Sequence, residues 1–361
     1  MVRFRDIMGG KKAGHEKHPI SSHEPGPEIQ RKETSPAKEK REPELVLSSS
    51  EPELESITES RSLRSPESIY NEALILIKRL LDNPEEGKER SDEIRAIVRE
   101  LVQEVTSGHR EILFLTQEQS PSCYLYCHSV NVTILALYLG LAMDYDKEEL
   151  LILGLAAFLH DIGMSKCISI VQKKGKLTHG EFNIVQRHSE DGKNWVKNID
   201  TLPHRERVGT IIWQIHERIN GKGYPMGLRG DQIDEMAKVI SLVDTYETLT
   251  HPRPYREKIS PPQVMEMLLE MKDEIFDAEL IRTMVEQFSL YPLGSYVRLN
   301  TGDIGKVVGI NKEYPTRPQV ELLFNGPGKK VEHRTLNLAQ APAVQITEVM
   351  DEEELILEQK E

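Results

Sequence analysis

The chain has 361 residues, and its 46 Lys and Arg against 59 Asp and Glu give a formal net charge of −13. Sequence-independent binding to DNA or RNA requires clustered positive charge, so this acidic composition argues against either as a partner. A chain of this length is expected to form about two domains.

Three features predict a cytoplasmic protein with no membrane span. The longest apolar stretch, residues 130–143, is interrupted by polar residues and glycines and falls short of the roughly 18 apolar residues of a spanning helix. Basic residues, rather than an apolar signal core, lie near the first residue. The 3 cysteines are too few for a disulfide framework, which fits a reducing compartment.

Residues 1–65 are predicted to form a disordered N-terminal tail. Phe4 is their only aromatic residue, and Ser, Pro, Glu and Lys dominate the rest. Such a segment cannot bury enough apolar surface to offset the entropy of ordering it. A docking or phosphorylation segment remains the functional alternative to a solvated leader.

Residues 66–119 are predicted to form an N-terminal helical region. Ser65 and Pro66 make a good helix start, with an N-cap followed by proline in the first turn. Apolar residues recur at helical spacing over 69–81, and Pro84 and Gly87 end that helix. A second amphipathic stripe covers residues 94–105.

Residues 120–290 are mostly helical by their pattern and are predicted to form the main domain. Residues 150–159 are a nearly continuous apolar run and predict a buried core helix. Joints that contain proline, at 202–203, 252–254 and 261–262, separate further helices.

After Tyr291 the pattern changes to short strands, predicted over 296–299, 305–310 and 320–324, with turns at 302–303 and 325–328. Residues 291–350 are therefore predicted to form a small all-β, barrel-like module. Residues 351–361 are expected to be an acidic C-terminal end. The predicted fold class is mainly α, a helical bundle followed by this β module.

Histidines and aspartates recur through the main domain. His160 and Asp161 are adjacent and directly follow the buried helix, and the other candidates are His128, His188, His216 and Asp244. Imidazole and carboxylate together suit Fe, Mn, Zn or Ni. A carboxylate can bridge two ions, and two metals about 3.5–4 Å apart are a common device for attack on a phosphodiester. Any one of these histidines alone is more often a surface or core residue than a ligand.

The sequence around these residues resembles the HD-GYP domain family from about Tyr126 to Phe288, close to half of the chain. The matching series is His160-Asp161-Ile162-Gly163, Lys176-Leu177-Thr178, His188, His216-Glu217-Arg218, Gly221-Lys222-Gly223-Tyr224-Pro225, Val243-Asp244-Thr245-Tyr246 and Arg253-Pro254-Tyr255-Arg256. The β module also resembles a C-terminal extension seen on many members.

This resemblance implies an all-α HD-type domain that hydrolyses cyclic di-GMP, a bacterial second messenger, to pGpG or GMP, with His160 and Asp161 as catalytic residues. It implies two ions, most often Fe or Mn. The first would be bound by His128, His160, Asp161 and Asp244, and the second by bridging Asp161 with His188 and a histidine pair before Glu217. Tyr224, Arg253 and Arg256 would contact the guanine and phosphate groups of the substrate.

The sequence departs from the family pattern at four positions. Ile215 replaces one histidine of the pair, so the second site is expected to bind its ion weakly. The first site keeps all four of its residues and is expected to bind its ion firmly. Met164 stands where the family usually carries a Lys, and Asn220 where it carries an Asp. Tyr124 replaces the Glu of members with a third metal, so no third metal is expected.

Three functions remain open on the sequence. The first is a cyclic di-GMP phosphodiesterase with reduced activity. The second is a catalytically degenerate module that binds cyclic di-GMP or a partner with a GGDEF domain. The third is an HD phosphohydrolase for other phosphate esters. It is ranked last because it leaves the Gly-Tyr-Pro motif unexplained. A homodimer is possible in each case.

Overall fold

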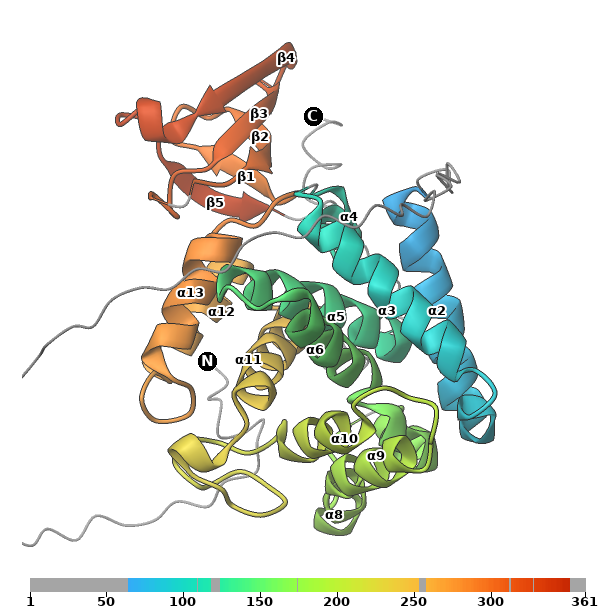
Figure 1. The fold of residues 1–361 in the computed structure, drawn as a ribbon. Helices are drawn as coiled ribbons and strands as arrows, with labels where there is room; N and C mark the ends of the chain where they lie inside the picture. Colours follow the sequence, from blue (N-terminus) through green and yellow to red (C-terminus); the bar gives the residue numbers. More distant parts are fainter. Residues whose placement is uncertain are drawn as a thin grey trace, which may run out of the picture. The chain divides into compact units, whose positions relative to one another are not determined.

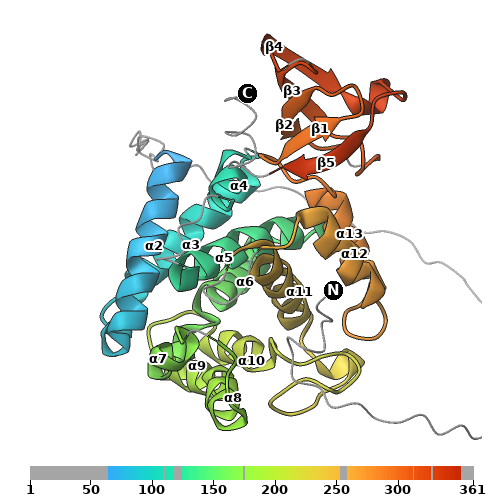
Figure 2. The same ribbon diagram turned by 180° about the vertical axis from the view of Figure 1, so that it is seen from behind.

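The computed structural model describes residues 64–350, apart from 109, 118–123, 174, 253–257, 312 and 327. All but two residues of the predicted tail, and the whole predicted acidic end at 351–361, lie outside this part of the chain. The described chain forms a mainly helical body, followed in sequence by an antiparallel sheet (Figures 1 and 2).

Three helices lie at the centre of the helical part. They are α5 (Tyr124–Ala142), α6 (Lys147–Leu159) and α11 (Glu235–Thr250). Both α6 and α11 pack against α5, and both views show the three side by side (Figures 1 and 2). The predicted core helix at 150–159 is confirmed, since all ten of these residues are buried in α6.

The N-terminal helices α2 (Pro66–Asp82) and α3 (Ser91–Thr106) pack on one side of this centre. The predicted start of α2 is confirmed, because the Ser65 side chain accepts a hydrogen bond from the backbone N–H of Ser68. The 3₁₀ turn η1 (Pro84–Gly87) and the short helix α4 (Glu111–Leu115) complete this region. The buried face of α2 includes Tyr70.

The remaining helices follow in chain order. The turn η3 (Ile162–Lys166) and the helix α7 (Ile168–Val171) precede α8 (His179–Gln186), α9 (His188–Lys197) and α10 (Arg205–Gln214). A further turn, η4 (Gly230–Gln232), precedes α11, and α12 (Pro261–Glu270) and α13 (Ala278–Phe288) end the helical part. Helix α9 packs against both α10 and η3, which brings the histidine-bearing ends of these elements together.

Among the described helices, α5 is the one whose length and composition would allow it to cross a membrane, and 83% of its most apolar window is buried inside the protein. This burial explains why α5 is apolar on every side, since helices surround it. It also carries His128 and Asn131, both buried.

The C-terminal sheet has five strands in the order β4-β3-β2-β1-β5, and every pair is antiparallel. The strands are β1 (Tyr296–Leu299), β2 (Ile304–Gly309), β3 (Gln319–Phe324), β4 (Lys330–Asn337) and β5 (Ile346–Met350), with the turn η5 (Leu338–Gln340) after β4. The predicted β module is thus present.

The predicted barrel-like closure was wrong, because the described sheet is open and ends at β4 and β5 without a pairing between them. In the segment between β4 and β5, several backbone carbonyl oxygens accept hydrogen bonds from a side chain. The Arg317 guanidinium donates to the carbonyl oxygens of Leu338, Pro342 and Val344 at 3.2–3.3 Å. The Arg317 side chain therefore satisfies carbonyls of the segment between β4 and β5.

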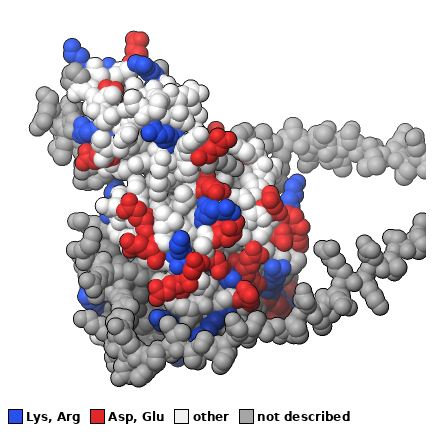
Figure 3. All heavy atoms as spheres, turned by 90° about the vertical axis from the view of Figure 1, so that its left-hand side faces the viewer, with Lys and Arg blue, Asp and Glu red and all other residues white. Residues whose placement is uncertain are grey.

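Acidic side chains gather on the face of the helical part that Figure 3 presents, with Lys and Arg between them. The described surface drawn there is consistent with the chain's net charge of −13.

Candidate metal centre

The six predicted ligands converge from five places in the helical part. His128 lies on α5, and Asp244 lies on α11. His160 ends α6 and Asp161 follows it directly. His188 begins α9, and His216 comes two residues after the last residue of α10. Residues separated by more than a hundred positions thus gather in one largely buried cluster.

The first group consists of His128, His160 and Asp244, whose ligand atoms all lie within 4.8 Å of one another. The Nε2 atom of His128 is 3.3 Å from Nε2 of His160 and 3.2 Å from Oδ1 of Asp244. Both histidines are almost fully buried. Asp161 belongs to this group as well, since its Oδ2 atom lies 3.5 Å from His160 Nε2 and 3.8 Å from His128 Nε2.

The second group consists of Asp161, His188 and His216, again within 4.8 Å. The other oxygen of Asp161, Oδ1, faces Nε2 of His188 at 3.6 Å. The Nε2 atoms of His188 and His216 are 2.8 Å apart. One carboxylate therefore presents one oxygen to each group, which is the arrangement of a carboxylate that bridges two ions.

The hydrogen bonds of the outer ring nitrogens decide where the protons lie. Nδ1 of His160 faces the carbonyl oxygen of Ala157 at 2.7 Å, and Nδ1 of His188 faces that of Val185 at 2.5 Å. A carbonyl can only accept, so both Nδ1 atoms carry the proton. Nδ1 of His128 likewise donates to the Glu247 carboxylate. Each ring then turns its Nε2 atom toward the other rings and the two carboxylates, and this atom can bind a cation through its lone pair once its proton is given up.

The spacing of these atoms fits a transition ion. Ligand distances of about 2.0–2.2 Å place neighbouring donor atoms about 3–3.5 Å apart around one tetrahedral or octahedral ion. The contacts from His128 Nε2 to His160 and to Asp244, at 3.3 and 3.2 Å, fall in this range. The first group therefore fits a metal closely, whereas the distances in the second group, 2.8 Å between His188 and His216 and 3.6 Å between His188 and Asp161, lie just outside the range on either side.

Electrostatics favour charged carboxylates at this site. Burial opposes ionisation of Asp161, but the neighbouring His160, His188 and His128 outweigh it and lower its pKa. The pKa of Asp244 is also lowered, against the cost of burial, by its hydrogen bond with His128. Burial and the nearby His188 lower the pKa of His216 to about 3, so its ring is neutral.

Gly163 allows the turn after Asp161 to approach α9 closely. A Cβ atom at this position would lie 2.0 Å from the carbonyl oxygen of His188, a distance that no side chain tolerates. The glycine of the His-Asp-Ile-Gly motif therefore brings Asp161 beside His188.

A loop formed by residues 220–229 covers His216. The Tyr224 ring stacks on the His216 ring with centroids 4.9 Å apart, and the backbone N–H of Tyr224 donates to the His216 carbonyl at 3.1 Å. Burial raises the pKa of Tyr224, so its phenol stays protonated. The Glu217 carboxylate fixes the loop by accepting from the backbone N–H groups of Met226, Gly227 and Leu228 at 2.6, 3.1 and 2.9 Å.

The departures from the family pattern lie around this pocket. Ile215 is 1% exposed, so its aliphatic side chain fills core space where the pattern has an imidazole. Met164 contacts the Cys167 sulfur. Lys166, the nearest described Lys after it in sequence, pairs with Asp191 at 2.5 Å. Asn220 keeps a side-chain acceptor, since its Oδ1 accepts from the backbone N–H of Lys222.

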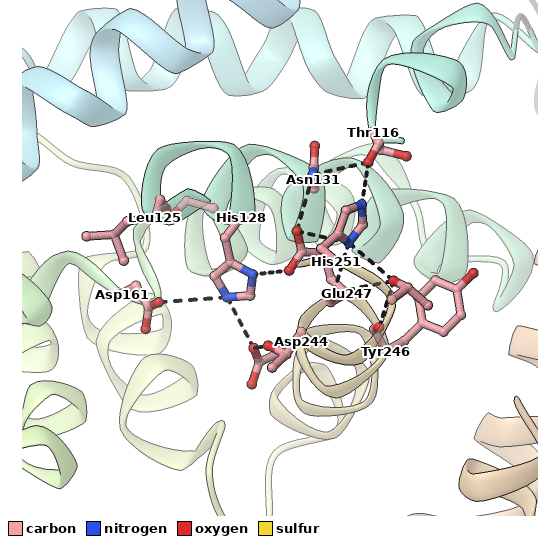
Figure 4. A network of polar contacts seen from close by, with 12 residues as sticks. Thr116, Leu125, His128, Asn131, Asp161, Asp244, Tyr246, Glu247 and His251 are labelled. Atoms are coloured by element: carbon pink, nitrogen blue, oxygen red, sulfur yellow. Dashed lines mark hydrogen bonds and ion pairs between the residues drawn. The ribbon is translucent and has the colours of Figure 1, made fainter. Parts of the chain in front are cut away.

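Two of the three predicted substrate contacts, Arg253 and Arg256, lie outside the described residues. Two buried residues that the sequence analysis missed, Glu247 and Asn131, contact the site (Figure 4). Glu247 comes three positions after Asp244 on α11 and Asn131 three after His128 on α5, so helical spacing places each near the face of its ligand.

A helical body that converges histidines and aspartates into two ligand groups defines a class of metal-dependent HD-type protein. The family model described as "HD domain" matches residues 75–280, more than half of the chain. The chain belongs to the HD domain family, and the resemblance to HD-GYP proteins is confirmed. A second model, "KOW domain associated with HD domain", matches residues 296–358.

Curated relatives carry names from cyclic dinucleotide hydrolysis. The cyclic di-GMP phosphodiesterase PA4108 of Pseudomonas aeruginosa is 31% identical over 234 residues, 64% of this chain and 56% of that one. The cyclic di-GMP phosphodiesterase response regulator RpfG of Xanthomonas campestris is 29% identical, covering 61% and 54%. The 3'3'-cGAMP-specific phosphodiesterase 1 of Vibrio cholerae is 30% identical, covering 47% and 40%. The chain thus spans about half the length of these relatives or less.

One solved structure, Bd1817, described as an HDG"Y"P protein from Bdellovibrio bacteriovorus, is 19% identical with a TM-score of 0.49. The likeness covers 63% of this chain and 73% of that one.

Proposed function

We propose that this chain is a cytoplasmic, metal-dependent phosphodiesterase that hydrolyses cyclic di-GMP to pGpG or GMP, slowly, in bacterial second-messenger signalling. The observation that carries the proposal is the position of Asp161, whose two oxygens face two separate groups of imidazole nitrogens. The names of the relatives support cyclic di-GMP as the substrate.

The residues would bind two ions, with Fe or Mn as the proposed metals. His128, His160, Asp161 and Asp244 form the proposed first site, and Asp161, His188 and His216 the second. When bound, such a pair activates a water and neutralises charge on the phosphodiester during in-line displacement. The protein supplies fixed tautomers and a buried pocket, so the donor atoms need little rearrangement to bind the ions.

The proposed substrate contacts lie beside the second group. Tyr224 is stacked on His216 by its own backbone hydrogen bond, which places a protonated phenol next to the metal pocket. Arg253 and Arg256 are proposed to contact phosphate and guanine, because a guanidinium pairs with phosphate oxygens and stacks on bases.

Reduced activity follows from two residues. Ile215 leaves the second group with three donors, and even changes around metal ligands cost about 10–100-fold in affinity or activity. Met164 removes a cation that the family pattern has next to the His-Asp pair, and the Lys166 ammonium is already paired with Asp191. A missing phosphate-clamping cation costs several kcal/mol of transition-state stabilisation.

The same two residues favour one alternative, a degenerate module that binds cyclic di-GMP or a GGDEF-domain partner without hydrolysing the nucleotide. Its specific support is the burial of Ile215, which offers no ligand atom to a second ion.

Turnover assays with the full-length chain distinguish these functions. Protein purified without oxygen and loaded with Mn²⁺ or Fe²⁺ is incubated with cyclic di-GMP, 3'3'-cGAMP and mononucleotides, and products are separated by chromatography. We expect slow formation of pGpG, its loss in His188→Gln, and its retention in His179→Gln, since His179 is exposed on α8. The double variant Ile215→His with Met164→Lys should be at least about tenfold faster.

Binding of cyclic di-GMP without turnover would support the degenerate module instead. Turnover of mononucleotides in preference to cyclic dinucleotides would support another HD phosphohydrolase. The proposal would be contradicted if the chain neither bound nor hydrolysed any of these nucleotides.

A further inference from the structure

A buried chain of polar side chains leads from the metal pocket to the N-terminal helix α2. It starts at His128, whose Nδ1 atom points away from the other ligands, and passes through Glu247 and Asn131 to Tyr70. Figure 4 shows the inner part of this chain, with Glu247 between His128 and Asn131. All four residues are at most 7% exposed.

Glu247 is placed to fix the His128 ring. One carboxylate oxygen, Oε2, contacts Nδ1 of His128, and the other, Oε1, accepts from the Asn131 amide at 3.2 Å. Because a carboxylate can only accept, Nδ1 keeps its proton, and Nε2, the atom that faces Asp244 and Asp161, is the one that would bind an ion. A carboxylate on the outer nitrogen also makes the ring a stronger ligand.

Asn131 is placed to fix Glu247. Its Nδ2 group donates to Glu247 and to the carbonyl oxygen of Thr116 at 3.2 Å, while its Oδ1 accepts from the Tyr70 hydroxyl at 2.9 Å. The amide can satisfy these partners in one orientation only, since a flip would bring its N–H groups to the Tyr70 side and its oxygen to two acceptors. His251, at the end of α11, contacts the same Thr116 carbonyl from the other side at 2.9 Å (Figure 4).

Tyr70 lies outside the segment that matches the HD family model, which begins at residue 75. The outer end of the chain is thus supplied by the first described helix of this protein, while His128, Asn131 and Glu247 lie on helices inside the matched segment. Any movement of α2 that withdraws the Tyr70 hydroxyl leaves Asn131 Oδ1 without this hydrogen-bond donor.

We propose that Glu247 is a positioning residue of the metal centre, and that Tyr70, through Asn131, couples the packing of α2 to metal affinity at His128. The inference rests on the metal centre of the proposed function and extends it to a route by which the N-terminal region acts on that centre.

The sizes of the effects follow from the kinds of contact. Glu247→Gln removes the charge beside His128 and presents an amide where two donors expect an acceptor, so metal affinity should fall about 10–100-fold. Tyr70→Phe removes one neutral hydrogen bond at the far end of the chain, so metal affinity should fall about 2–10-fold.

Cobalt binding to the full-length chain tests this proposal. Co²⁺ has visible absorption bands that change with its ligands, and its affinity is measured by competition with a coloured chelator. The variants are Glu247→Gln, Tyr70→Phe and the control Tyr246→Phe, which removes a buried tyrosine hydroxyl from α11 outside the chain of contacts. Thermal unfolding of each metal-free protein, measured alongside, separates loss of metal affinity from loss of folding.

We expect weaker binding and shifted cobalt bands in Glu247→Gln, a smaller loss in Tyr70→Phe, and no change in Tyr246→Phe. Wild-type affinity and bands in both test variants would overturn the proposal. Wild-type affinity in Tyr70→Phe alone would overturn the coupling to α2, and this variant decides the matter if Glu247→Gln does not fold. A wild-type chain that binds no cobalt would instead overturn the metal centre, and this inference with it.

Discussion

Replacing Glu217 with Gln tests whether the loop that covers His216 is fixed by one buried carboxylate. Glu217 is 3% exposed, and its two oxygens accept from three consecutive backbone N–H groups, those of Met226, Gly227 and Leu228. Gln has the same shape, but only one of its two terminal atoms accepts.

The cost can be worked out from this geometry. If the amide oxygen takes the place of Oε1, it keeps the contacts with Met226 and Gly227, and its NH₂ group then faces the N–H of Leu228. One hydrogen bond to a charged group is lost, worth about 1.5–3 kcal/mol, and a donor is left without a partner. We therefore expect the free energy of unfolding to fall by about 2–4 kcal/mol.

Urea unfolding of the metal-free chain measures this loss, and cobalt affinity measures its effect on the second ligand group. Glu274→Gln is the matched control. Its carboxylate is exposed and makes a long ion pair, 3.9 Å, with Lys222 of the loop formed by residues 220–229. That change should cost less than about 0.5 kcal/mol. Equal stability of Glu217→Gln and wild type would refute the argument that this carboxylate anchors the loop.

Further predictions concern other parts of the molecule. Burial lowers the pKa of His216 to about 3 in the folded chain, whereas this histidine titrates near pH 6.5 in the unfolded chain. As the pH drops, only the unfolded chain binds the proton, so the free energy of unfolding falls. Between pH 7 and 5 this amounts to about 2 kcal/mol, and His216→Gln should lose that part of the pH dependence in urea unfolding. Gly163→Ala should destabilise the chain by about 1–3 kcal/mol in the same assay, since its Cβ would meet the His188 carbonyl, whereas Gly180→Ala, with open space around it, should not; equal effects would refute this. Arg317→Met should lower the melting temperature of the chain by freeing the carbonyls after β4, and an unchanged melting temperature would argue against that role.

Local signals predicted much of the fold. The Ser65 cap and Pro66 define the start of α2, and the apolar run at 150–159 defines the core of α6, because a cap and an apolar run are both patterns of residues close in sequence. Closure of the sheet could not be predicted this way. It depends on whether the edge strands β4 and β5 come to lie side by side, and this is decided by contacts between residues distant in sequence, such as those of Arg317 with carbonyls more than twenty residues later.

The candidate site divides along the same line. The resemblance to a family identified the six ligands and Tyr224, and the structure places them together, although their role as ligands stays a prediction. The contacts of Glu247 with His128 and Asn131 join residues 119 and 116 positions apart. Hydrogen bonds of this range depend on how α5 and α11 pack, so no local pattern in the sequence specified them.

The central claim is that Asp161 bridges two metal ions of unequal affinity, and elemental analysis of the full-length chain tests it most directly. The protein is purified without oxygen from cells supplied with iron and manganese, and metal per chain is measured before and after dialysis, for wild type and for Asp161→Asn. We predict that wild type keeps one ion firmly and loses a second on dialysis, and that Asp161→Asn keeps neither. A wild-type chain that holds no metal and takes up none on reconstitution would contradict the account.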